Sequence, residues 1–263
     1  MVWPSPLPKL PRCSAGSHAL ARHGMRPWWC AVILGAVCFA ASPAVALDWE
    51  TLAGASTDFG NSSYAYAGVG IIEPVSDRIA LRARIMFSYL TYEFQQAGTT
   101  VDAEAWAVTP LVGFRYQLRP DMSVSLFGGG QIKRTDFEGQ EPSTRNDDGG
   151  AAQFEYHYQV SPQADILVLY QYASGDASNW GRVAFKREVL SFGSQEEFAL
   201  GLGVEGIGMG NDDFMAFQGG PLLEIRHRPT NGSFLIGVGP KYYSAEGVQD
   251  VRPYLSLSIY FPF

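Results

Sequence analysis

The sequence predicts an all-β fold: a closed, antiparallel, up-and-down transmembrane β-barrel of about twelve strands that follows a cleaved signal peptide. Apolar and polar residues alternate along most of the chain after residue 46, as in strands with one apolar face. The longest alternating runs, 79–94 and 100–118, far exceed the ~5–6 residues of an ordinary globular strand. The chain also ends in an alternating strand whose last residue is aromatic, Phe263.

Composition excludes several other classes. Outside the N-terminus no window of ~18 consecutive apolar residues exists, so helical membrane spans are excluded for the body of the chain. With 46% hydrophobic and 13% aromatic residues, the chain is too apolar to stay unfolded in water. Its formal net charge of -7 argues against a nucleic-acid partner, which requires a basic surface.

Residues 1–46 have the features of a secretory signal peptide. Basic residues and no acidic ones precede an apolar run at 28–41, and small residues lead up to a cleavage site after Ala46. A start at Met25 would leave a leader of ordinary proportions, 25–46. An uncleaved N-terminal anchor helix is the alternative, although the apolar run is short for one. The barrel domain is then 47–263.

All three cysteines, Cys13, Cys30 and Cys38, lie in this leader. Residues 47–263 therefore offer no disulfide, no cysteine metal site and no thiol catalysis. We expect no metal and no cofactor.

Turn signals divide the barrel region into twelve candidate strands, although ten or fourteen are also possible. They are 49–59, 64–73, 79–94, 100–118, 123–134, 150–160, 165–174, 179–189, 197–206, 214–227, 233–244 and 250–263. An even number places both chain ends on the same, periplasmic side, together with the proline-containing turns at 74–77, 119–121, 161–163 and 229–232. The longest acidic connector, 135–149, then lies outside. The long turn around 190–196 fits this scheme poorly.

The last strand carries the strongest membrane signal. Its apolar face includes Ile259, Phe261 and Phe263, and we expect these residues to be the signal that the barrel-assembly machinery reads. A soluble periplasmic β-sandwich is the alternative, because alternation alone does not separate the two.

The polar faces of the strands, if they point inward, bring charges of both signs into the lumen. The basic residues are Arg82, Arg84, Arg115, Lys133, Arg182, Lys186, Arg226 and Arg252, and the acidic residues are Glu155, Glu197, Glu205 and Glu224. One interpretation is a selective pore with a mildly cationic lining. The other is a narrow, closed interior in which these charges pair. Inward-facing Tyr92, Tyr243, Tyr254 and Tyr260 are candidates for stacking on sugar rings or for interfacial girdles.

We find no catalytic motif and predict no enzyme. Only His157 and His227 fall in the barrel region, and no serine lies in a Gly-x-Ser-x-Gly motif. His157 has Glu155 and Ser161 nearby, which is a weak hint of a Ser-His-acid set. The acidic loops 146–148 and 211–213 are interpreted as solvated loops rather than cation sites. The glycine-rich stretches 128–130 and 201–210 indicate close strand approaches or bends, not phosphate loops.

Five segments resemble the family of bacterial cellulose biosynthesis protein BcsS and occur in the family's order. They are ASTD at 55–58, SYAYAG at 63–68, VDAEAW at 101–106, VGFRY at 112–116 and VEGIGMGND at 204–212. The resemblance implies an exported outer-membrane barrel, accessory to cellulose biosynthesis or export in a Gram-negative bacterium, with no catalytic residues to carry over.

The expected partners are outer-membrane lipid and lipopolysaccharide, the barrel-assembly machinery, and components of cellulose synthesis or export. Two other functions stay open at this point. One is a narrow general channel or a structural barrel unrelated to cellulose, and the other is a lipid-modifying outer-membrane enzyme.

Overall fold

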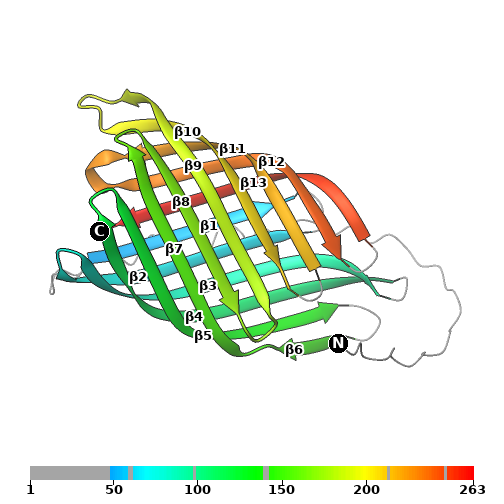
Figure 1. Ribbon diagram of the computed structural model, residues 1–263. Coiled ribbons are helices and arrows are strands. Elements are labelled where there is room, and N and C mark those ends of the chain that lie inside the picture. Colours follow the sequence, from blue (N-terminus) through cyan, green and yellow to red (C-terminus); the bar gives the residue numbers. More distant parts are fainter. Residues whose placement is uncertain (1–47, 59–61, 97–98, 139–141, 212–213, 246–247) are drawn as a thin grey trace, which may run out of the picture.

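The computed structural model describes residues 48–58, 62–96, 99–138, 142–211, 214–245 and 248–263. The signal peptide expected at 1–46 lies outside these residues. The described chain is almost entirely β (Figure 1). Its strands are β1 (Asp48–Thr57), β2 (Ser63–Ser76), β3 (Ile79–Gln96), β4 (Thr99–Arg119), β5 (Met122–Glu138), β6 (Ser143–Asn146), β7 (Gly149–Ser161), β8 (Ala164–Ala173), β9 (Ser178–Phe192), β10 (Phe198–Gly210), β11 (Phe214–His227), β12 (Gly232–Ala245) and β13 (Val248–Pro262).

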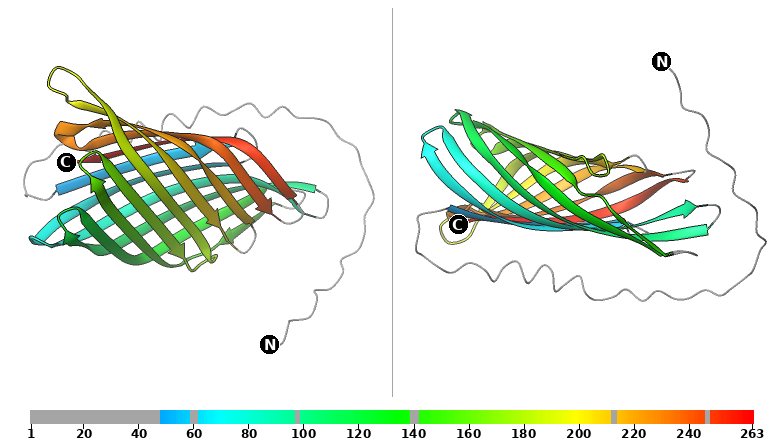
Figure 2. Two further views of the ribbon diagram at one scale, coloured as in Figure 1. Left: turned by 45° about the horizontal axis from the view of Figure 1, so that its top comes forward. Right: turned by 90° about the horizontal axis from the view of Figure 1, so that it is seen from below.

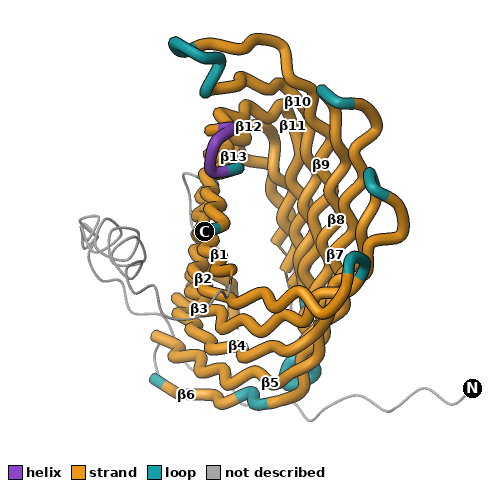
Figure 3. Tube along the Cα trace, turned by 90° about the vertical axis from the view of Figure 1, so that its left-hand side faces the viewer, coloured by secondary structure: helices purple, strands orange, loops and turns teal. Residues whose placement is uncertain are grey.

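Twelve of these strands form one closed wall. Each pairs antiparallel with the next in sequence, β5 pairs directly with β7, and β1 pairs with β13 to complete the ring. Figures 2 and 3 show the strands tilted around a common axis and enclosing an interior. Closure leaves no open sheet edge around the wall, which is the condition for crossing a lipid bilayer with strands. The predicted all-β, closed barrel of about twelve strands is confirmed.

Two connections differ from the prediction. The expected connector 135–149 is largely strand, because β5 continues to Glu138 and the short β6 pairs with it there. The turn expected at 190–196 is shorter, because β9 extends to Phe192 and β10 begins at Phe198, with a bulge between Leu200 and Gly201. The β5–β6 and β9–β10 hairpins are therefore longer than the alternation of side chains predicts. Their backbones stay paired where the apolar and polar residues no longer alternate regularly.

The wall has its apolar side outward. Val112 on β4 and Val204 on β10 are 66% and 59% exposed, and exposed apolar side chains recur on neighbouring strands around the barrel. The inward face combines many small and polar residues with a few large buried side chains such as Phe127, and Glu50 on β1 is 0% exposed. This distribution is the reverse of that in a soluble protein and is the pattern of membrane barrels. No helix among the described residues is long and apolar enough to span a membrane.

The two ends of the barrel differ. Trp49 and Phe263 exchange backbone hydrogen bonds of 2.9 and 2.6 Å, so the first and last strands meet at one end. The connections 77–78, 120–121, 162–163, 193–197 and 228–231 lie at that end, which we call the turn end. The opposite end, where β5 and β6 pair, is called the loop end.

Glycines allow some strands to approach closely. A Cβ at Gly129 would lie 2.0 Å from the Pro110 carbonyl oxygen, and one at Gly203 would lie 2.0 Å from that of Phe185. The glycine-rich stretches are thus close strand approaches at these two positions.

Candidate functional site

A four-residue ion-pair cluster lies inside the barrel near the turn end. Each of Arg82 and Arg84 on β3 contacts both Glu50 on β1 and Glu155 on β7. The four nitrogen-to-oxygen distances are between 2.5 and 2.7 Å, at or below the short end of charge-assisted hydrogen bonds. We call these residues the Glu50 cluster. It connects β1 to β7 across an arc that also contains β2, β3, β4 and β5.

Other side chains complete the surroundings of the Glu50 cluster. Both guanidinium groups lie over the Phe127 ring, at 5.0 Å for Arg82 and 4.9 Å for Arg84. Arg82 also donates a hydrogen bond to Ser125 Oγ at 3.1 Å. The Tyr260 hydroxyl donates to Glu50 at 3.4 Å. Buried charges are tolerated when they are paired and hydrogen-bonded, and Glu50 satisfies both conditions.

A second cluster joins three strands on the other side of the lumen. Arg182 on β9 contacts Glu205 on β10 at 2.6 Å. Glu205 also accepts hydrogen bonds from Tyr254 and Ser256 on β13, at 3.2 and 2.8 Å. These two contacts pass over β11 and β12, so they cross the interior rather than follow the wall.

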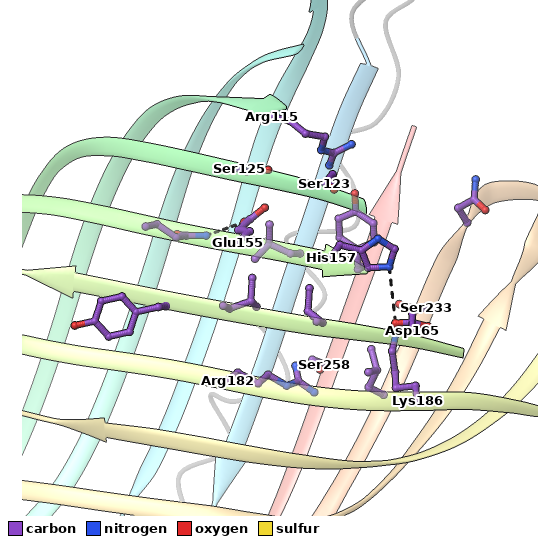
Figure 4. Close-up of a pocket in the computed structure, with 18 of the residues that line it drawn as sticks. Arg115, Ser123, Ser125, Glu155, His157, Asp165, Arg182, Lys186, Ser233 and Ser258 are labelled. Atoms are coloured by element: carbon purple, nitrogen blue, oxygen red, sulfur yellow. Dashed lines mark hydrogen bonds and ion pairs between the residues drawn. The ribbon is translucent and has the colours of Figure 1, made fainter. Parts of the chain in front are cut away.

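A third cluster lies closer to the turn end. Lys186 contacts Glu224 at 2.8 Å and Asp165 at 3.3 Å. Arg226 contacts the same two carboxylates, at 3.0 Å for Glu224 and 3.1 Å for Asp165. His157 Nε2 lies 3.9 Å from Asp165 (Figure 4). Four charges of alternating sign thus pair with one another on β8, β9 and β11.

Aromatic rings and further ion pairs project into the lumen at the loop end. Tyr92 on β3 stacks on Phe214 on β11 with ring centroids 5.5 Å apart, and Phe214 stacks on Tyr243 at 6.1 Å. Four strands separate β3 from β11 around the wall, so this stack spans the interior. Lys241 pairs with Asp58 at 3.1 Å, and Lys133 pairs with Asp176.

A cavity of about 510 Å³ runs beside these ion-pair clusters towards the turn end. Its lining extends from Tyr64, Tyr66 and Trp180 in the interior to Pro120 and Asn231 in the turns. Most of the lumen residues selected from the sequence line it, namely Arg82, Arg84, Arg115, Glu155, Arg182, Lys186, Glu224 and Arg226.

The remaining selected residues lie elsewhere. Lys133 is near the loop end, and Glu205 is buried and does not line the cavity. Arg252 pairs with Asp250 of its own strand at 2.5 Å, and the Glu197 carboxylate accepts a bond from Ser194 in a turn. Among the described residues Arg115 is the cavity-lining arginine for which no ion pair is found.

Sequence reasoning did not select five charged residues of these ion pairs: Glu50, Asp58, Asp165, Asp176 and Lys241. A signal for Glu50 was present, because Trp49 must face lipid if the strand alternates, and Glu50 must then face inward. The same alternation extends to Asp58, the residue that follows β1, and predicts that it also faces inward. Asp165 and Lys241 adjoin predicted turns or rims, where a charge is usually solvated.

The residues considered for catalysis or cation binding have other contacts. Ser161 Oγ accepts a hydrogen bond from the Gln163 amide at 3.3 Å, within the turn that follows β7. His157 faces Asp165 of the neighbouring strand instead. In the loop 146–148, Asp147 accepts from Arg145 at 2.8 Å. Asp212 and Asp213 lie outside the described residues.

A closed antiparallel wall with an apolar exterior and an ion-paired interior is the architecture of outer-membrane β-barrel proteins. Within that class the chain belongs to the family of cellulose biosynthesis protein BcsS, which matches residues 53–263. The match includes the last strands, so the resemblance seen in the sequence is confirmed over nearly the whole barrel. Comparison with curated proteins gives no match.

Several solved structures are similar at low identity. The translocator domain of autotransporter NalP from Neisseria meningitidis is 11% identical, with 89% of this chain and 92% of that chain covered and a TM-score of 0.47. LpxR from Salmonella typhimurium is 10% identical, with 81% and 99% covered and a TM-score of 0.46. The CymD monoaromatic hydrocarbon channel is 8% identical, with 82% and 88% covered and a TM-score of 0.42.

Proposed function

We propose that this protein is a non-enzymatic barrel of the outer membrane that assists cellulose biosynthesis or export. Membership of the BcsS family supports the link to cellulose. The exposed apolar wall supports insertion in a bilayer, since such a surface would be insoluble in water. The expected signal peptide and assembly machinery would deliver the chain to that membrane.

The observation that carries the accessory role is the set of contacts crossing the lumen. The Glu50 cluster, the Glu205 contacts to β13 and the Tyr92–Phe214 stack each join strands that are not neighbours. The Tyr92–Phe214 stack, which joins strands far apart around the wall, narrows the lumen towards the loop end, and the ion pairs narrow it beside the cavity. We therefore propose a barrel that binds or positions export components rather than one that conducts the polymer.

The chemistry of the interior supports a non-enzymatic role. Glu50, Glu155, Glu205 and Glu224 all accept charge-assisted hydrogen bonds from arginine or lysine. Each of these carboxylates is already held by a cation of the barrel, so its oxygens are engaged within the protein rather than directed at a substrate.

The test combines location with cellulose output. A deletion strain is complemented with the wild-type gene, cellulose is quantified, and membrane fractions are examined for a heat-modifiable band. We expect the band in the outer membrane and restored cellulose only with the gene. Normal cellulose without the gene would overturn the accessory role, and a soluble protein would overturn the location.

An enzymatic role is tested separately with labelled lipid A and phospholipid. We expect purified protein and its His157→Ala variant to give the same product profile as buffer alone. Acyl release by the wild type that His157→Ala abolishes would contradict the proposal.

A narrow channel is the second candidate, because the cavity extends to the turns at Pro120 and Asn231. Only the layers nearer the loop end would have to rearrange to open such a path. Single-channel recordings separate the two candidates: steady conductance of the wild-type barrel favours the channel.

A further inference from the structure

We propose that the cavity at the turn end binds a neutral glucan segment of a few sugar units, which enters from the periplasmic side. This proposal rests on the function proposed above and specifies its ligand. The argument comes from the charge balance of the cavity, its hydrogen-bonding groups, its aromatic rings and its closed inner end.

Apart from Arg115, for which no ion pair is found among the described residues, the basic side chains of the cavity are neutralised by carboxylates. Arg82 and Arg84 share Glu50 and Glu155, Arg182 is held by Glu205, and Lys186 and Arg226 share Asp165 and Glu224. A cation whose hydrogen-bonding capacity is directed to a buried carboxylate attracts an external anion weakly, since the local field is cancelled. The cavity is thus suited to an uncharged polar ligand.

Neutral hydrogen-bonding side chains are distributed along the same lining. Gln153, Gln159 and Gln171 project from β7 and β8, and Ser123, Ser233 and Ser258 come from β5, β12 and β13. An amide offers both donors and an acceptor, and a hydroxyl offers both, so together they match a ligand that presents many hydroxyl groups. Such a ligand is a saccharide.

Aromatic rings are available at two depths of the cavity. Tyr260 lies on β13 towards the turn end, and Tyr66 and Trp180 line the inner part. Tyrosine and tryptophan combine a large apolar face with a polar group, which suits a pyranose ring with apolar C–H faces and polar edges.

The dimensions favour a short segment and not a passing polymer. The volume of about 510 Å³ falls within the ~300–1,000 Å³ of small-molecule sites. Towards the loop end the path meets the Tyr92–Phe214 stack. A glucan that enters at the turns would therefore stop inside, so the site would hold a chain end.

The test measures binding to the full barrel purified in detergent micelles. Isothermal titration with cellohexaose should show saturable binding, and hexagalacturonate, a polyanionic hexasaccharide, should bind at least tenfold more weakly. Gln153→Ala combined with Gln159→Ala should weaken cellohexaose binding at least tenfold. Gln249→Ala is the matched control, because Gln249 is an exposed glutamine of β13 outside the cavity lining, and it should change nothing.

Three outcomes would overturn the proposal: no cellohexaose binding by a heat-modifiable barrel, tighter binding of hexagalacturonate, or equal weakening by Gln249→Ala. Failure here is distinguishable from failure of the proposed function. A strain that still requires the gene for cellulose, with a barrel that binds no glucan, would retain the accessory role and exclude this ligand.

Discussion

Glu205 on β10 occupies the space that a side chain on Gly237 of β12 would need. A Cβ on Gly237 would lie 1.9 Å from Glu205 Oε1 and 2.5 Å from Ser256 Oγ. Gly70 has the same relationship to Glu50, at 2.7 Å from Oε1. Inward-facing glycines thus leave room for two buried carboxylates, and the ion-pair clusters depend on backbone positions as well as on charged residues.

Gly237→Ala should displace the Glu205 carboxylate and weaken its contacts with Arg182 and Ser256. Overpacking of this kind typically costs about 1–3 kcal/mol. We expect a lower midpoint in urea unfolding followed by tryptophan fluorescence in micelles. Gly206→Ala is the control, because a Cβ on Gly206 meets no atom within 4 Å. Equal midpoints for the two variants would contradict the steric argument.

Glu50→Gln should destabilise the barrel strongly, because it leaves two arginines of the Glu50 cluster with a single carboxylate. Removing one partner of a buried ion pair costs about 3–5 kcal/mol. The free energy of unfolding is the measurement, and adding Arg84→Met to Glu50→Gln should recover part of the loss. The exposed Arg119–Asp121 pair is the comparison, since Arg119→Gln should change stability by less than about 1 kcal/mol. A Glu50→Gln effect as small as that would show that the cluster is hydrated.

Tyr92→Ala combined with Phe214→Ala should open the loop end of the lumen. These rings meet across the interior, and their removal leaves smaller side chains that water can pass. Planar-bilayer recordings should show larger or more frequent current steps than the wild type. Tyr242→Ala removes a similar ring from the outward-facing side of β12 and should leave the currents unchanged. Currents that stay at the wild-type level in the double variant would assign closure to the ion pairs alone.

The strands could be predicted from the sequence because lipid and lumen impose opposite chemistry on alternate residues. All twelve wall strands match their predicted ranges to within a few residues, and β11 matches at both ends. The four-residue β6 was not predicted, since Ser143–Asn146 has no apolar face and depends on pairing with the end of β5.

The partners inside the lumen could not be predicted in the same way. Alternation along each strand predicts that Arg82 and Glu155 both face inward. It does not show that these two residues, which are 73 positions apart in the sequence, are in contact. Which charges meet depends on the tilt and closure of the wall. The choice between a cationic pore and a paired interior therefore needed three-dimensional coordinates.

The C-terminal residue offers a test that separates assembly from closure. The Phe263 side chain is 59% exposed, while its backbone exchanges two hydrogen bonds with Trp49 where β1 and β13 meet. Deleting Phe263 removes the side chain and these bonds, whereas Phe263→Ala removes only the ring. If the assembly machinery reads the aromatic ring, both variants should lose most of the heat-modifiable band from the outer membrane. Loss of the band in the deletion alone would show that Phe263 acts in assembly through its backbone pairing with β1. Val251→Ala is the control, because it shortens an exposed side chain of the same strand, and it should assemble normally.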